Sequence, residues 1–154
     1  MPAPTPPAAT LDQYKAYMTD VGNIGSRYTT AQTFYLSVVS ALIGIVTFVA
    51  KDAGAFQKYL WAVTAFITFF TALLCYIWWR TLDFYSHLFK AKFTVLKKME
   101  TGSSTIYPIF TDEWAELENS RSGTLIYHEK LIPILIGLAA VVAAVLSVIR
   151  VVFS

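Results

Sequence analysis

Residues 59–79 read YLWAVTAFITFFTALLCYIWW, and no charged side chain interrupts them. Two further runs, residues 33–50 and 131–149, are also free of charge. A helix rises about 1.5 Å per residue, so runs of about 18 to 21 residues are long enough to cross roughly 30 Å of hydrocarbon. The whole chain is 56% hydrophobic and only 14% charged, whereas soluble domains are about 25% charged. The sequence therefore predicts an all-α, polytopic membrane protein with three transmembrane helices.

The next residues, RTLDFYSHLFKAKFTVLKKME (80–100), have the pattern of an amphipathic helix. Apolar side chains recur every three or four positions, and the lysines fall largely on the opposite face. No Gly or Pro occurs between Trp79 and Glu100, so we expect the second span to continue as one helix to Glu100. An apolar face outside the bilayer must pack against something, and we interpret it as an interface between copies of the protein. The predicted oligomer interface consists of Leu82, Tyr85, Phe89, Phe93, Leu96, Trp114 and Leu117.

The N-terminal region has two parts of different composition. Residues 1–10, MPAPTPPAAT, are rich in Pro and Ala and are predicted to be a disordered tail. Residues 11–32 form an N-terminal arm with apolar side chains at helical spacing. Gly22 and Gly25 interrupt that pattern, so we expect a short interfacial helix followed by a break rather than one long helix.

Residues 80–130 are expected to form a helical layer outside the membrane, together with the arm. Gly102 is placed to end the long helix. A short helix over 112–118 should then begin with Thr111 as its N-cap. The last helix should begin near Leu125 and become the third span, residues 131–153.

The distribution of Lys and Arg predicts the orientation in the membrane. Nine of the 12 lie in the arm and in residues 80–130, and three lie in the short loop 51–58 or after the third span. Because positively charged segments stay on the cytoplasmic side, the N-terminus and residues 80–130 should be cytoplasmic. The loop 51–58 and the C-terminus should then be extracytoplasmic.

Small and hydroxyl-bearing residues recur on one face of each of the first two spans. The face consists of Ser37, Ser40, Gly44 and Thr47 in the first span, and of Thr64, Thr68 and Thr71 in the second. Such faces allow helix backbones to approach closely. In a ring of subunits they would alternatively line a pore. The sequence leaves helix packing and pore lining both open.

The sequence offers no case for chemistry. The two histidines are far apart, no HxxxH or CxxC spacing occurs, and the runs typical of nucleophiles or phosphate loops are missing. We therefore predict that the protein is not an enzyme and has no catalytic, cofactor or metal site. The lysines after the second span could bind nucleic acid, but acidic residues follow in the next helix. We therefore expect Lys92 and Lys97 to pair with Glu113 and Glu116, and we predict no nucleic-acid partner.

Four segments together resemble a known family: TFYLSVVSALIGI, IWWRTLDFYSHLFKAKFTVLKKME, YPIFTDEWAEL and HEKLIPILIG. They resemble the RipA-type family of small bacterial membrane proteins, and the resemblance extends over residues 14–145. It implies an inner-membrane protein that assembles as a homo-octamer, linked to growth in host cells or to stress adaptation. It implies no catalytic residues, and the Pro/Ala-rich tail departs from the family pattern.

The predicted function is therefore a non-enzymatic, homo-oligomeric scaffold of the inner membrane, whose partners are its own copies and the lipid bilayer. The alternative is an oligomeric pore or channel, including a membrane-permeabilising effector of a defence system. The alternative requires the hydroxyl faces of the first two spans to point toward a common axis.

Overall fold

The computed structural model describes residues 11–51, 57–103, 106–119 and 125–153, and these fold into four helices. They are α1 (Leu11–Lys51), α2 (Gln57–Thr101), α3 (Ile109–Asn119) and α4 (Leu125–Phe153). No β-strand occurs in these ranges. Helices α1, α2 and α4 each contain a stretch long and apolar enough to cross a membrane. The all-α class and the three membrane-spanning helices are thereby confirmed. The predicted tail, residues 1–10, lies outside the described residues.

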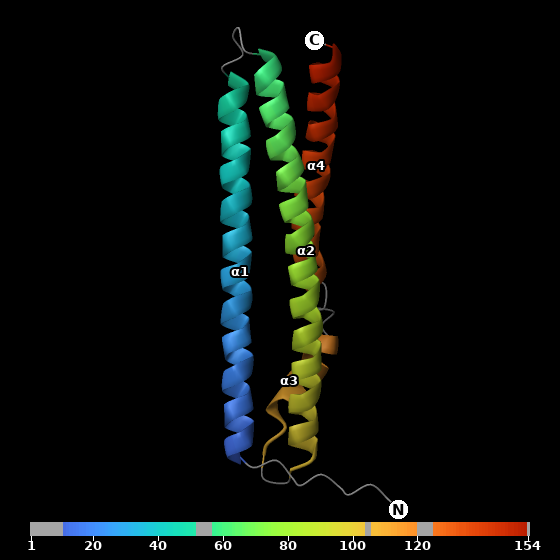
Figure 1. Cartoon of the computed structure of the whole chain (residues 1–154). Helices are drawn as coiled ribbons and strands as arrows, with labels where there is room; N and C mark the ends of the chain where they lie inside the picture. Colours follow the sequence, from blue (N-terminus) through green and yellow to red (C-terminus); the bar gives the residue numbers. More distant parts are fainter. Residues whose placement is uncertain (1–10, 52–56, 104–105, 120–124, 154) are drawn as a thin grey trace, which may run out of the picture. The chain divides into compact units, whose positions relative to one another are not determined.

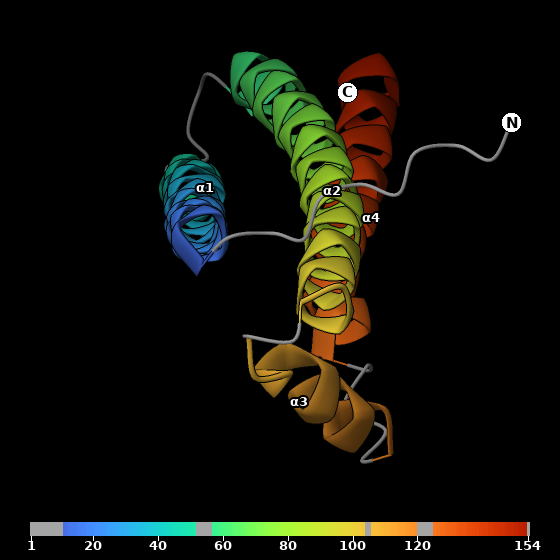
Figure 2. The same ribbon diagram turned by 90° about the horizontal axis from the view of Figure 1, so that it is seen from below.

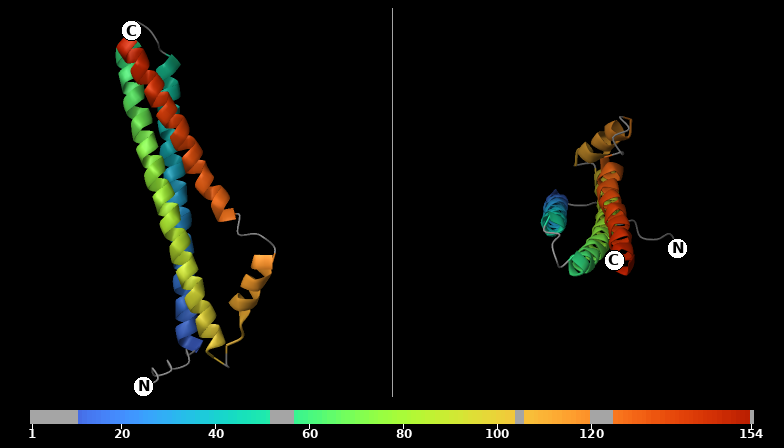
Figure 3. Two further views of the ribbon diagram at one scale, coloured as in Figure 1. Left: turned by 90° about the vertical axis from the view of Figure 1, so that its right-hand side faces the viewer. Right: turned by 90° about the horizontal axis from the view of Figure 1, so that it is seen from above.

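The helices divide into two compact units, and α1 and α2 contribute to both. Unit 1 contains Met1–Tyr28 and Phe84–Ile126, and unit 2 contains Thr29–Asp83 and Tyr127–Ser154. In unit 2, α2 runs between α1 and α4, as Figure 1 and the right-hand view of Figure 3 show. In unit 1, the short helix α3 lies beside the last turns of α2 (Figure 2). The three uncharged runs belong to unit 2, which is the membrane-spanning part.

Helix α1 continues through Gly22 and Gly25, so the predicted break in the arm is wrong. Each Gly inside a helix costs up to about 1 kcal/mol relative to Ala. Packing compensates for this cost: Tyr14 and Ile24 are buried, and Tyr17, Met18 and Val21 pack on the core of unit 1. Contacts with distant parts of the chain therefore outweigh the local preference.

Helix α2 is continuous from Gln57 to Thr101, which confirms the predicted extension beyond the second span. Its end is set by Gly102, whose N–H donates to the carbonyl of Lys98 at 3.0 Å. A Cβ at Gly102 would lie 3.0 Å from the same carbonyl oxygen, so only glycine fits without a shift. The start of the last helix at Leu125 is confirmed as well.

Helix α3 begins at Ile109, three residues before the predicted start. Thr111 is therefore inside the first turn and is not the N-cap. The carboxylate of Glu100, at the end of α2, takes that role instead. A side chain that is distant in the sequence thus satisfies the free N–H groups of the first turn, as every helix start requires.

Candidate functional surfaces and a buried carboxylate

The apolar face of residues 80–100 is largely covered within the subunit. Leu82 and Leu96 are buried, and Leu96 belongs to a core with Tyr14 and Ile106. Phe93 lies against Phe110 of α3, with ring centroids 6.1 Å apart. The face thus finds partners in α1 and α3 of its own chain, which the periodicity of the sequence alone does not reveal.

Aromatic contacts with α1 cover two further residues of this face. The ring of Tyr28 meets Tyr85 edge-on at 5.4 Å and Phe89 at 5.8 Å. The side chains of Trp114 and Leu117 lie outside the described part of the structure. The role of the seven predicted interface residues between subunits stays a prediction.

The hydroxyl face of the second span is buried inside unit 2. Thr64, Thr68 and Thr71 are 8%, 6% and 4% exposed. The hydroxyl of Thr68 donates to the carbonyl of Thr64 at 2.8 Å, and that of Thr71 donates to Ile67 at 2.8 Å. This part of the predicted face is used for packing between helices of one subunit.

The matching face of the first span has the opposite environment. Ser37, Ser40, Gly44 and Thr47 are all exposed in the single chain. The hydroxyl of Ser37 donates to the carbonyl of Thr33 at 2.8 Å, and that of Thr47 donates to Ile43 at 2.8 Å. These hydroxyls bond to their own helix, so the face needs no water to satisfy them. The structure separates the two predicted faces, one covered and one free.

A belt of polar contacts joins the three helices where the uncharged runs end. Lys130 forms an ion pair with Asp83 at 2.8 Å, and the amide of Gln32 donates to Glu129 at 3.3 Å. The hydroxyls of Tyr35 and Thr81 lie 3.2 Å apart in a hydrogen bond. Sequence reasoning missed this belt, although its charged residues all lie within four positions of an uncharged run. Such contacts fix the helices of unit 2 against one another.

Trp78 lies among these contacts and has an unusual environment. Its ring is buried and stacks on Tyr35 at 6.1 Å with an interplanar angle of 10°. Its buried indole N–H has no hydrogen-bond partner among the described residues. The ring is therefore held by packing rather than by its polar atom.

Unit 1 is organised around the buried carboxylate of Glu100, which is 2% exposed. It accepts hydrogen bonds from the hydroxyl of Tyr14 at 2.8 Å and from the N–H of Phe110 at 2.9 Å. The N–H of Thr111 donates at 2.9 Å and the hydroxyl of Thr111 at 2.8 Å. One side chain of α2 thereby joins α1 and α3.

Glu100 lies 21 residues beyond Trp79 and is therefore outside the uncharged run. The hydrogen bonds around it favour its charged form. Burial by itself would raise the pKa of Glu100, but the hydrogen bonds from Phe110, Thr111 and Tyr14 lower it below its usual value. Burial, together with the bond to Glu100, raises the pKa of Tyr14 to about 12. Glu100 therefore acts as an ionised N-cap for α3 at neutral pH.

A second contact between α1 and α2 involves Lys92. Its ammonium group pairs with Asp20 and lies 4.6 Å from the ring centroid of Tyr17. The hydrogen bond to Asp20 raises the pKa of Lys92. The expected pairing of Lys92 with Glu113 or Glu116 is therefore wrong. The partner of Lys92 comes instead from the N-terminal arm, residues 11–32.

Among the described residues, no three His, Cys, Asp or Glu side chains come together in a way that would hold a metal ion. The titratable groups that do meet, in the belt and at Glu100, hold helices together. Their arrangement is that of structural contacts.

Comparison with known proteins identifies the family to which the chain belongs. Residues 11–149 match the octameric membrane protein family (8xMP). The chain belongs to this family. No curated protein and no solved structure matches the chain.

Membership in the octameric membrane protein family agrees with the surface of unit 2. Large apolar side chains point outward along the spans, for example Phe66 at 70% and Phe69 at 65% exposed on α2, and Leu135 and Leu138 on α4. Such a surface is stable only against lipid or against other copies of the chain. Localisation in a membrane agrees with this surface, and the family name implies octameric self-assembly.

Proposed function

We propose that this protein is a non-enzymatic scaffold of the bacterial inner membrane that works as a homo-octamer. The proposal rests on one observation: polar side chains of the described residues contact other groups of the same subunit. The hydroxyls of Thr68 and Thr71 bond to the backbone of their own helix, and the charged pairs of the described residues join helices within one subunit. The family supports the octamer. Chemistry or transport would leave such groups directed at a substrate or a water-filled axis.

The orientation belongs to the same proposal. The nine-to-three distribution of Lys and Arg supports a cytoplasmic N-terminus and a cytoplasmic unit 1, with the C-terminus outside. The resemblance to RipA-type proteins supports a role in stress or host adaptation. In this proposal, unit 1 presents the same helical surface repeatedly below the membrane.

A pore is the second candidate, and one observation favours it. The face of α1 that carries Ser37, Ser40, Gly44 and Thr47 is exposed in the single chain. Eight copies of this face around one axis would give a narrow channel lined by small side chains and hydroxyls. Of the two predicted faces only that of α1 is available to line it, because the corresponding face of α2 is buried.

Cysteine accessibility separates the two candidates. Ser40→Cys and Thr47→Cys are made singly in a Cys75→Ser background, and the intact protein in membranes is treated with a small aqueous thiol reagent. Thr68→Cys, which is buried, and Phe66→Cys, which is exposed on α2, serve as controls. The scaffold predicts that all four are protected, because lipid or another helix covers them. Rapid reaction at Ser40→Cys and Thr47→Cys alone would refute the scaffold and favour the pore.

A further inference from the structure

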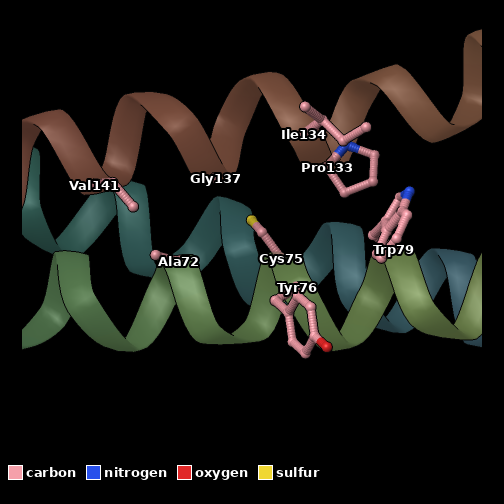
Figure 4. Close-up of a pocket in the computed structure, with 8 residues that line it drawn as sticks. All are labelled: Ala72, Cys75, Tyr76, Trp79, Pro133, Ile134, Gly137 and Val141. Carbon is pink, nitrogen blue, oxygen red and sulfur yellow. The ribbon is translucent and has the colours of Figure 1, made fainter.

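Helices α2 and α4 enclose an elongated groove in unit 2. It has a volume of about 350 Å³, near the lower end of the roughly 300–1,000 Å³ of ligand sites. Pro133 and Cys75 are buried beneath it, and Tyr76, Ile134 and Val141 are exposed at its rim. Figure 4 shows Cys75 and Trp79 of α2 directed toward α4 and Val141 of α4 directed toward α2, whereas Tyr76 points away from α4. The lining is almost entirely apolar.

Glycine determines the shape of the groove. A Cβ at Gly137 would lie 3.2 Å from the Cβ of Cys75, so the two helices approach closely there. Figure 4 shows Cys75 directed toward α4 at Gly137, with no side chain on Gly137 to fill the space. Larger residues one turn away on either side, Ile134 and Val141, form the rim. The groove therefore runs along the helix axes between α2 and α4.

The dimensions of the groove match one leaflet of a bilayer. It extends from Val141 to Pro133 on α4, which at 1.5 Å per residue is about 12 Å. One leaflet contributes half of the roughly 30 Å hydrocarbon core. The groove begins at Trp79, where the uncharged run ends, and continues toward the middle of the span. Its length and position suit a single extended acyl chain.

Two polar groups lie where the headgroup of such a lipid would be. Trp79 lies beside Pro133 at the end of the groove, and its indole N–H forms no hydrogen bond with the described residues (Figure 4). Arg80 is exposed, has no partner among the described residues and lies one helical turn after Tyr76 of the rim. The neighbouring Lys130 is already paired with Asp83. Arg80 is therefore the cation available for a phosphate.

We propose that this groove binds one phospholipid with an anionic headgroup. The acyl chain lies between α2 and α4 over Gly137, and the headgroup lies beside Trp79 and Arg80. The apolar lining recognises the chain, and the charge of Arg80 selects the anionic headgroup. This lipid would be a fixed part of the protein surface, distinct from the mobile lipid around the spans.

Photocrosslinking tests the site. The full-length protein is reconstituted in vesicles of equal phosphatidylglycerol and phosphatidylcholine, with a trace of either lipid carrying a diazirine in its acyl chain. Peptide mass spectrometry then locates the cross-links. We expect them to be concentrated at Cys75, Tyr76 and Ile134, above the level at the exposed Phe66 and Phe69.

Matched variants complete the test. Val141→Trp fills the groove, whereas Val142→Trp adds the same side chain at a neighbouring position that does not line it; the two valines are 48% and 51% exposed. Only Val141→Trp should lower cross-linking in the groove, by several-fold. Arg80→Gln should lower the preference for phosphatidylglycerol over phosphatidylcholine about fivefold, the effect of one basic side chain at a membrane surface.

Several results would overturn the proposal. One is equal cross-linking in the groove and at Phe66, and another is an equal effect of the two tryptophan variants. Cross-linking that Arg80→Gln leaves unchanged for both lipids would remove the anionic headgroup from the site. If the wild-type groove gives no cross-links and Val141→Trp alone reduces the oligomer mass by light scattering, a second copy of the chain occupies the groove instead.

Discussion

Replacing Glu100 should release α3 from the rest of unit 1. The carboxylate is buried and accepts four hydrogen bonds from Tyr14, Phe110 and Thr111. Hydrogen bonds to a charged group contribute about 1.5 to 3 kcal/mol each, but the cost of burying the charge reduces their sum. Glu100→Ala removes every acceptor, so we expect a loss of about 3 to 5 kcal/mol, comparable to breaking a buried charged contact.

Hydrogen-exchange mass spectrometry measures this loss directly. Amides of α3 exchange through local opening, and a loss of 3 kcal/mol or more accelerates that exchange at least about a hundredfold. Tyr14→Phe removes a single donor and should cause a smaller acceleration in α3. Peptides from α4 should be unchanged, because that helix belongs to unit 2.

Glu116→Gln is the matched control, because Glu116 lies on α3 itself and is exposed. It should exchange like the wild-type protein. If Glu100→Ala also leaves the exchange of α3 unchanged, the carboxylate does not hold this helix. The helix would then be retained by apolar contacts such as that between Phe93 and Phe110.

Two further predictions concern the pH dependence of the Glu100 contact and the buried ring of Trp78. Because its hydrogen bonds lower the pKa of Glu100, the stability it supplies is present above the unfolded pKa of about 4.3 and is lost as the pH falls through the lower folded value. Exchange of α3 should accelerate below about pH 4 in the wild type but show no such step in Glu100→Gln; a step that persists in the variant would assign it to another group. Trp78→Phe should cost much less than Trp78→Ala, for which about 3 to 5 kcal/mol is expected, because the indole N–H has no described partner to lose. Equal losses of thermal stability in detergent would show that the N–H is bonded after all.

The spans were predictable because a bilayer imposes a simple rule on the sequence. About 20 apolar residues are needed to cross it, and a charge within the run is costly. Residues 33–50, 59–79 and 131–149 obey this rule, and each lies within one helix of the structure. The continuity of α2 was predictable for a similar reason, since nothing before Gly102 interrupts the backbone.

The partners of each helix face were not predictable in the same way. Periodicity shows that residues 80–100 have an apolar face, but the side chains that cover it lie far away in the sequence, in α1 and α3. Tyr14 is 86 residues from the carboxylate it contacts. Local preference also predicted a break at Gly22 and Gly25, but α1 is continuous. The contacts that hold α1 together come from distant parts of the chain and cannot be seen in a short stretch of sequence.

The hydroxyl faces show why the two interpretations of a sequence pattern need a structure to separate them. A threonine that bonds to the carbonyl four residues earlier is equally satisfied in a helix contact and beside water. The sequences around Ser40 and Thr68 therefore look alike, and only the position of the neighbouring helices distinguishes them. In this chain, α2 lies between α1 and α4, so its face is covered while that of α1 is free.

Because the apolar face of residues 80–100 is covered within the subunit, the effect of a mutation there on oligomer size must be interpreted with care for internal packing. Phe93 contacts Phe110 within the subunit, and Phe89 contacts Tyr28. Replacing both phenylalanines by serine therefore removes packing that one chain already has, so a smaller particle in detergent would not by itself identify an interface. Hydrogen exchange of α3 in the same variant distinguishes the cases. If these residues form a direct interface, the oligomer becomes smaller while the amides of α3 stay protected from exchange. If they act only through packing inside the subunit, the amides of α3 exchange faster, and assembly is affected only as a consequence.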